Sequence, residues 1–212
     1  MAKYYNIDDL RLLAKKRVPQ AVFDYADGAA EDESTKANNR SAFQKWKFIP
    51  DVLIDVSEVD THTKVLETDM PYPFALGPTA ISYLFHHAGE PAVARAASKR
   101  NFPSTLSSIA STNIEDYAES SNGSVWFQMY VWKNREISHD FIKRCKASNY
   151  KAIMLTVDVP VGGKRERDLR SGMTVPPQLT LASIIDAAFH PHWWWNFIFG
   201  PKISFANVKE RF

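Results

Sequence analysis

The sequence predicts a parallel α/β fold: the first part of a (β/α)8 barrel, preceded by an N-terminal helical segment. From about residue 71, short apolar strands alternate with helical segments, and strand starts recur at roughly 22 to 29 residues, the spacing of a βα unit. The strands end in polar residues, which suits the carboxyl mouth of a barrel, where ligands bind. With 212 residues, 45% of them hydrophobic, the chain can bury a sizeable core.

Residues 1–70 are expected to form helices and a short extended piece. Asn6 suits the N-cap of a first helix, because its side chain can accept a hydrogen bond from a free backbone N–H group. Pro19 suits the first turn of a second helix, which Gly28 can end. A third helix is expected from Glu31 to Phe43.

Residues 71–170 are expected to hold four βα units. The fourth strand is continuous and β-branched, as in a strand that is covered on both faces. The expected strands are PFALGP (73–78), STLSS (104–108), SVWFQMYV (124–131) and AIMLTV (152–157), and the expected helices are 90–100, a short one opened by a capping box from Thr112 to Glu115, and 136–148.

A closed barrel needs eight strands, and no fifth strand is evident after residue 160. We therefore expect one truncated domain over residues 1–212, with 171–212 as an aromatic-rich insertion of loop and helix. An open sheet of four strands is the alternative. No G-x-G-x-x-G turn supports a dinucleotide-binding version of that sheet.

Charge and composition exclude several classes of protein. The 26 basic and 24 acidic residues are interspersed, with a net charge of +2, so we expect no nucleic-acid partner. The single Cys145 excludes an intramolecular disulfide and fits a reducing compartment. The polar, acidic N-terminus is unlike a secretory signal, and no run of about 18 apolar residues predicts a membrane span. We therefore expect a cytoplasmic protein.

Polar residues at the ends of the strands are the first candidates for a ligand site. Each alone would be read as a cap of the next element, but their recurrence on consecutive strands favours a ligand, because polar groups at a barrel mouth need partners. Gln and Thr offer the donors and acceptors that bind the edge of a planar heterocycle. The set comprises Ser107, Ser108, Gln128, Tyr130, Thr156 and Asp158.

The loop VGGKRERDLRSG, which follows the fourth strand, gathers positive charge. An Arg from this loop could bind a carboxylate through two parallel hydrogen bonds, although most of its residues suit a solvated loop. The six histidines are scattered and lack a carboxylate partner at motif spacing, so none is a convincing base. There is no zinc pattern and no nucleophile elbow, and we expect no metal site.

The segment FHPHWWWNFIFGPK concentrates aromatic residues between His and Lys. Trp193, Trp194 and Trp195 suit an interfacial anchor, because indole rings favour the headgroup depth of a membrane. An aromatic cluster that packs on the rest of the protein or on another subunit is the alternative. The first reading predicts peripheral attachment to the inner face of the cell membrane.

Six motifs in order make the chain resemble the FMN-dependent α-hydroxy-acid dehydrogenases and oxidases, and its tail resembles the membrane-associated bacterial L-lactate dehydrogenases within them. The resemblance covers nearly the whole chain and implies the TIM-barrel fold. The motifs are FDYADGAAEDESTKANNRSAF, FIPDVLIDVSEVDTHT, ALGPTA, TLSSIAST, WFQMYVWKNR and LTVDVPVGGKRERD, and the tail reads SGMTVPP and HPHWWWNFIFGPKISFANV.

The resemblance implies an FMN cofactor and a role for each matching residue. The backbone of Pro78, Thr79 and Ala80 would lie against the flavin ring, whereas the side chains of Ser107, Gln128 and Thr156 would hydrogen-bond its edge. Tyr25, Tyr130 and Arg165 would bind the substrate. Ile109 stands where glycolate oxidases carry Trp, and a smaller residue there would leave room for bulkier 2-hydroxy acids.

The implied reaction is oxidation of an L-2-hydroxy acid, first of all L-lactate, to the 2-keto acid. Electrons would pass to a quinone or another acceptor, and the complete protein would be a homo-oligomer. The family's catalytic His and neighbouring Arg belong to a SNHGGRQ-type motif that is absent here, so we expect the base beyond Phe212. A glycolate- or mandelate-oxidising homologue, or a non-catalytic half-barrel that needs a second chain, are the alternatives.

The downstream reading frame tests this expectation directly. We expect the coding sequence after Phe212, in any frame, to encode a Lys-Gly pair, a SNHGGRQ-type motif and a GRP phosphate loop, because these supply the base and hold the phosphate. Sequencing the locus checks it. Unrelated sequence at that place would count against the dehydrogenase and in favour of the half-barrel.

Overall fold

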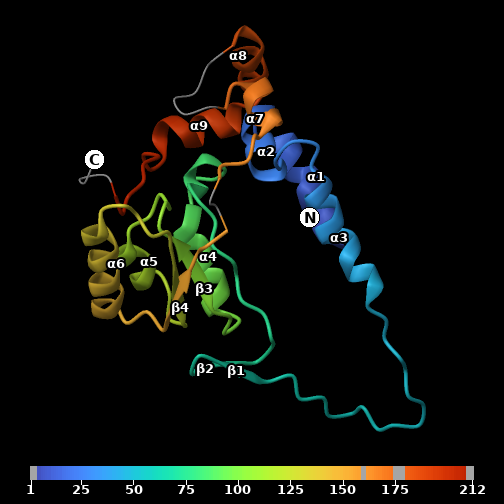
Figure 1. Ribbon diagram of the computed structural model, residues 1–212. Helices are drawn as coiled ribbons and strands as arrows, with labels where there is room; N and C mark the ends of the chain where they lie inside the picture. The colour runs from blue at the N-terminus through green and yellow to red at the C-terminus, as the bar shows by residue number, and fades with distance from the viewer. Residues whose placement is uncertain (1–3, 159–160, 174–179, 209–212) are drawn as a thin grey trace. The chain divides into compact units, whose positions relative to one another are not determined.

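The computed structural model describes residues 4–158, 161–173 and 180–208. They divide into two compact units, coloured along the chain in Figure 1. The first unit lies within Met1–Glu58 and Val161–Trp195, and the second within Val59–Pro160 and Asn196–Phe212.

The first unit is helical, and the three helices expected from the sequence are confirmed. Asn6 caps the first of them by accepting a hydrogen bond from the Asp9 N–H group, and Gly28 ends the second. The third begins at Ser34, three residues later than expected, and runs on into a 3-10 turn. The helices are α1 (Ile7–Arg17), α2 (Gln20–Asp27), α3 (Ser34–Ser41), η1 (Ala42–Lys45), α7 (Glu166–Ser171) and α8 (Leu181–Ala188).

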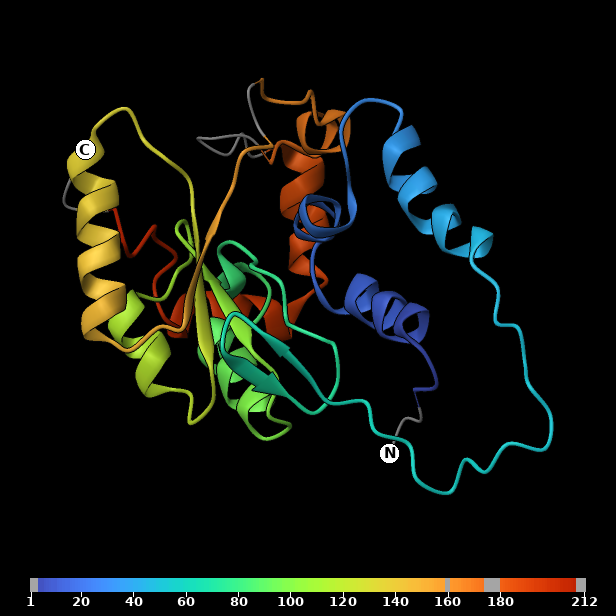
Figure 2. The ribbon, with the colours of Figure 1, turned by 60° about the horizontal axis from the view of Figure 1, so that its bottom comes forward.

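The second unit is built on a three-stranded parallel sheet in the order β3-β4-β5. Helices α5 and α6 lie side by side against one face of the sheet (Figures 1 and 2), as right-handed βαβ crossovers require. The strands are β3 (Ser104–Ser107), β4 (Val125–Met129) and β5 (Ala152–Leu155), and the helices are η2 (Ser82–Leu84), α4 (Gly89–Ser98), α5 (Ile114–Glu119) and α6 (Arg135–Ala147).

The two faces of the parallel sheet carry different side chains, because residues alternate along a strand. Leu106 and Phe127 pair in register on the helix-covered face and are 1% and 0% exposed. The Phe127 ring packs edge-on against Phe141 and Tyr150, with ring centroids 5.3 and 6.1 Å apart. The side chains of the alternate residues of each strand therefore lie on the opposite face of the sheet.

A short hairpin packs beside the amino ends of the parallel strands. Its strands β1 (Thr63–Val65) and β2 (Thr68–Met70) are antiparallel, and the two residues that join them have positive φ angles. Thr68 is buried and accepts a hydrogen bond of 3.4 Å from the Trp126 indole of β4. The short extended piece expected before residue 70 is this hairpin.

Two local predictions from the sequence are wrong. The strand expected at 73–78 is reduced to one bridge, in which Leu76 pairs with Ser104, because Pro73 and Pro78 have no N–H group to donate to a sheet. The capping box expected from Thr112 is also wrong, because Asn113 caps α5 instead.

The last parallel strand, β5, does not meet the expectation of a strand that is covered on both faces. Leu155 is 54% exposed, and Ile153 and Met154 are also exposed. In the part of the chain that the structure describes, β5 pairs with β4 only. Its other edge and its apolar side chains therefore face no neighbouring strand there.

The aromatic segment contains the helix α9 (Pro191–Phe199), after which the chain returns to the core of the second unit. Val208 is buried in that core, and the Asn207 side chain accepts a hydrogen bond from the Ile114 N–H group and donates one to the Thr112 carbonyl. Among residues 4–158, 161–173 and 180–208, no helix is long and apolar enough to cross a membrane.

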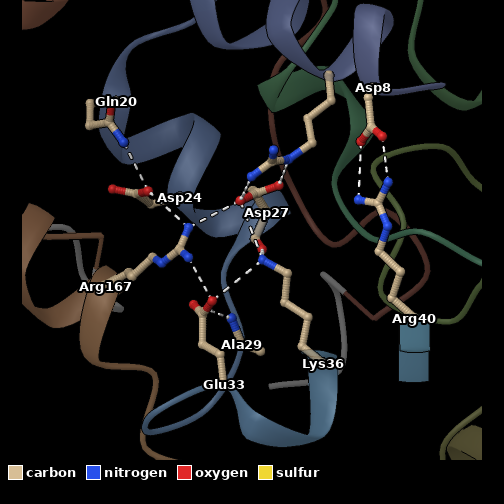
Figure 3. A network of polar contacts seen from close by, with 10 residues as sticks. Asp8, Gln20, Asp24, Asp27, Ala29, Glu33, Lys36, Arg40 and Arg167 are labelled. Atoms are coloured by element: carbon tan, nitrogen blue, oxygen red, sulfur yellow. Dashed lines mark hydrogen bonds and ion pairs between the residues drawn. The ribbon is translucent and has the colours of Figure 1, made fainter. Parts of the chain in front are cut away.

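In the first unit, an ion-pair network ties α7 to α2 and α3 (Figure 3). Arg167 contacts Asp27 at 3.0 Å and Glu33 at 2.6 Å, and Asp27 also binds Arg11 and Lys36. The hydrogen bond from Arg11, together with those from Arg167 and Lys36, holds the pKa of Asp27 well below its usual value. Carboxylates and cations that are far apart in sequence therefore join these helices.

We expect Asp27→Asn to lower the free energy of unfolding by about 1 kcal/mol at neutral pH, because three partly exposed cations lose one shared carboxylate. The lowered pKa means that the contribution of Asp27 is complete above about pH 5 and is lost as pH falls through the folded-state pKa, below the usual 3.8. Urea unfolding of the two proteins from pH 7 to pH 2.5 checks both statements.

Asp8→Asn is the matched control, because Asp8 pairs with Arg40 where both side chains are largely exposed. Its effect on the free energy of unfolding should be smaller than that of Asp27→Asn at every pH, because solvent screens an exposed ion pair. If the difference in free energy of unfolding between the original chain and Asp27→Asn stayed constant down to pH 2.5, it would contradict the lowered pKa of Asp27.

Candidate functional site

A cavity of about 530 Å³ lies at the carboxyl ends of the parallel strands in the second unit. Because β3, β4 and β5 run parallel, their last residues and the loops that follow them meet at one edge of the sheet. The lining residues from these strands and loops are Ser107, Ile109, Gln128, Tyr130, Met154, Leu155, Thr156, Val157 and Asp158, and Pro78 and Ala80 join them from the segment after the Leu76 bridge.

A chain of hydrogen bonds crosses the three strands at the edge of this cavity. The Ser107 hydroxyl donates to the Gln128 side-chain oxygen at 3.0 Å, and the Gln128 amide nitrogen donates to the Thr156 hydroxyl oxygen. Gln128 is 3% exposed, and the Ser108 N–H group also donates to its oxygen. Its amide is therefore oriented with the oxygen toward β3 and the nitrogen toward β5.

This orientation decides what the cavity edge can offer a ligand. The Gln128 amide carries two hydrogens and gives one to Thr156, and the Thr156 hydroxyl, which accepts that bond, has its own hydrogen to donate. The Ser107 oxygen accepts a bond from the Ile109 N–H group. The edge of the cavity thus offers hydrogen-bond donors of Gln128 and Thr156, and hydrogen bonds to neighbouring residues fix the orientation of these side chains.

The remaining walls of the cavity are largely apolar. Ile109 and Met154 contribute hydrocarbon, and Pro78 and Ala80 bring a stretch of backbone close to the same space. A flat ring with a polar edge matches this combination of apolar faces and an oriented hydrogen-bonding rim.

Most of the cofactor residues expected from the sequence lie on this cavity. Pro78, Ala80, Ser107, Gln128 and Thr156 line it, and so does Tyr130, which was expected to bind substrate. The exposed Thr79 does not line it.

Tyr25 and Arg165 come together in the first unit. The Arg165 guanidinium lies 5.5 Å from the centroid of the Tyr25 ring and donates a 2.6 Å hydrogen bond to the Tyr25 carbonyl. Asp168, one turn along α7, accepts a bond from the Arg165 Nε atom. The other basic residues of this segment have different partners: Lys164 and Arg170 pair with Glu166, and Arg167 belongs to the network of Figure 3.

Sequence reasoning missed two kinds of residue at these sites. The role of Asp168 could have been suspected from its spacing, since residues three apart on a helix are neighbours. Met154 and Val157 carry no such signal, because apolar residues within a strand are normally assigned to the core.

Comparisons with known proteins agree with the geometry. A family model described as FMN-dependent dehydrogenase matches residues 14–211. The chain is 42% identical over 97% of its length to a candidate L-lactate dehydrogenase of Mycobacterium tuberculosis, and 40% identical over 83% of its length to glycolate oxidase of Spinacia oleracea.

The solved structures that the chain matches agree with these relatives. The crystal structure of the monotopic membrane protein (S)-mandelate dehydrogenase superposes with a TM-score of 0.90 at 36% identity, covering 96% of this chain and 55% of that one. A soluble mutant of the membrane-associated (S)-mandelate dehydrogenase from Pseudomonas putida superposes with a TM-score of 0.77 at 40% identity, covering 86% of this chain and 52% of that one.

The chain spans about half the length of the curated relatives it matches. Its three parallel strands and their helices are part of a (β/α)8 barrel. The apolar cavity with its oriented Ser107–Gln128–Thr156 rim suits the flat ring of the FMN cofactor that this family uses. The family match over residues 14–211 and the shared barrel establish that the chain belongs to the FMN-dependent dehydrogenases.

Proposed function

We propose that this chain contributes to an enzyme that oxidises an L-2-hydroxy acid, with L-lactate as the substrate, to the 2-keto acid. The observation that carries the proposal is the hydrogen-bonded row of Ser107, Gln128 and Thr156 on the edge of the cavity. FMN, when bound there, would take up two electrons and pass them to a quinone or another acceptor.

The second unit would hold the cofactor. The donors of Gln128 and Thr156 would bind acceptor atoms on the edge of the flavin ring, and Ser107 would keep the Gln128 amide in its orientation. The backbone of Pro78, Thr79 and Ala80 would lie against the flat of the ring. Ile109 and Met154 would exclude water from the same space.

The first unit would hold the carboxylate of the substrate. Two nitrogens of Arg165 are occupied by Asp168 and by the Tyr25 carbonyl, which fixes the guanidinium while further N–H donors stay available for a carboxylate. The hydroxyls of Tyr25 and Tyr130 would bind the carboxylate or the hydroxyl group of the substrate. We propose that both units belong to one domain, which covers residues 1–212.

The names of the relatives suggest several substrates. The 42% identity to a candidate L-lactate dehydrogenase supports L-lactate, whereas other relatives are named for mandelate and glycolate. Ile109 on the wall of the cavity supports a substrate with a side chain, because it takes less space than the Trp that glycolate oxidases carry there.

We propose that the base that removes the hydroxyl proton is a His in a part of the enzyme that this chain does not contain. None of the cavity-lining residues is a His, and the relatives are about twice as long. The exposed edge of β5 supports the second candidate function, a non-catalytic half-barrel that pairs with another chain, because an exposed apolar strand edge invites pairing.

We expect the 212-residue chain to quench the fluorescence of added FMN, because its own residues line the cofactor cavity. Gln128→Leu should weaken FMN binding about tenfold, since it removes one hydrogen bond to the ring and releases Ser107 and Thr156. Titration of FMN followed by fluorescence measures both dissociation constants.

Glu119→Gln is the control for this titration, because Glu119 is exposed on α5 and should leave FMN binding unchanged. An unsubstituted chain that binds no FMN would favour the half-barrel that needs a second chain. Bleaching of bound flavin by L-lactate in this chain alone would contradict a base supplied from elsewhere.

We also propose that the enzyme is cytoplasmic and attaches to the inner face of the cell membrane through α9. Four apolar side chains of this helix are exposed: Trp195, Phe197, Ile198 and Phe199. Trp193 and Trp194 of the same helix pack edge-on against each other. Exposed indole and aliphatic side chains on a short helix are typical of a segment that lies in the membrane interface.

We expect replacement of Trp193, Trp194 and Trp195 by Ser to release the intact enzyme from liposomes of bacterial lipid, because the indoles supply the interfacial contact. Flotation on a density gradient measures the bound fraction. Phe48→Ser, which changes an exposed side chain outside α9, should leave flotation unchanged. Equal flotation of all three proteins would exclude α9 as the anchor.

A further inference from the structure

Glu90 is a buried carboxylate that neither substrate nor cofactor binding, as proposed above, uses. It is 3% exposed and lies in the first turn of α4, where the helix dipole favours an anion. Its Oε1 atom accepts hydrogen bonds from the N–H groups of Ser82 at 2.9 Å and Ser111 at 3.0 Å, and its Oε2 atom accepts one from the Thr112 hydroxyl at 2.9 Å. Within the described residues it forms no ion pair.

One partner of Glu90 belongs to the segment that carries Pro78 and Ala80 on the wall of the cavity. Ser82 begins η2 directly after Ile81, whose φ of 44° and ψ of 48° lie in the left-handed region. A β-branched residue adopts this conformation only when its surroundings impose it. The bond from the Ser82 N–H group to Glu90 is one residue away and supplies such a restraint.

The other partners belong to the connection between β3 and α5. Ser111 and Thr112 follow Ile109, which lines the cavity beside Ser107. A single oxygen of Glu90 binds both Ser82 and Ser111, so these two amide nitrogens can lie only a few ångströms apart. Two segments that line the cavity are therefore joined to each other through one carboxylate.

We propose that Glu90 is a positioning residue for the FMN site, which sets the separation between the Pro78–Ala80 wall and the Ser107–Ile109 wall. The inference rests on the proposed cofactor role of the cavity, and its structural part stands on the three hydrogen bonds alone. A second contact joins the same two segments directly, because the Thr112 hydroxyl lies 3.3 Å from the Tyr83 hydroxyl of η2.

Hydrogen–deuterium exchange and FMN titration of the full chain test this role. Glu90→Ala should speed exchange of the Ser82 and Ser111 amides at least about tenfold and weaken FMN binding by about the same factor, because both amides lose their acceptor. Glu90→Gln keeps an oxygen for both amides, so it should restore most of the protection and of the FMN affinity.

Glu115→Gln is the matched control, because Glu115 is a partly buried acid on α5 that pairs with Arg144 away from the cavity. It should lower the melting temperature but leave amide exchange at Ser82 and Ser111 and FMN binding unchanged. If Glu90→Ala does not fold, Thr112→Val, which removes one of the three bonds, should show the same two effects at smaller size.

The outcomes separate the two proposals. If the unsubstituted chain binds no FMN, the cofactor role of this chain by itself fails, while amide exchange still decides whether Glu90 joins the two walls. Unchanged exchange at Ser82 and Ser111 in Glu90→Ala would overturn the inference. Faster exchange with unchanged FMN affinity, or a Glu90→Gln variant that behaves like Glu90→Ala, would overturn it equally.

Discussion

The parallel register of β3, β4 and β5 is the constraint on which the candidate cofactor site depends. Ser107 lies level with Gln128, and Gln128 with Met154, so Thr156 falls one pleat further on the same face. A slip of one residue would turn Gln128 onto the helix-covered face and Phe127 into the cavity. Since Phe127 is fully buried against Phe141 and Tyr150, the apolar core enforces the register that aligns the polar row.

Different interactions stabilise the interior of each unit. The second unit has a core in which aromatic and aliphatic side chains pack between sheet and helices. In the first unit, α1, α3 and η1 bury no residue completely, and charged contacts between Arg167, Asp27 and Glu33 join helices that are distant in sequence. These contacts fix α7 against α2, and thereby place Arg165 over Tyr25. Such an arrangement is more sensitive to pH and salt than an apolar core.

The sequence predicts the helices and the strands β3, β4 and β5 well, because periodicity and capping are local properties. The strand expected at 73–78 does not form: the composition is apolar, but Pro73 and Pro78 lack the N–H groups that hydrogen-bond to a neighbouring strand. The row of Ser107, Gln128 and Thr156 could be expected from strand ends, whereas Tyr25 needed the family resemblance. Glu90 could not be found from sequence, since its partners lie 8, 21 and 22 residues away and only the fold brings them together.

The apolar side chains of β5 are exposed, although the sequence predicts a strand that is covered on both faces, and this exposure affects the cavity. The composition of β5 is that of a covered strand, yet Leu155 is 54% exposed and Val157 80% exposed among the described residues. Exposure of apolar side chains to water at these levels costs free energy. Leu155 and Val157 form one wall of the cavity together with Thr156. Covering them would also exclude water from the bonds that Thr156 and Gln128 offer a ligand. Under either candidate function, a surface that covered β5 would therefore also cover this wall of the cavity.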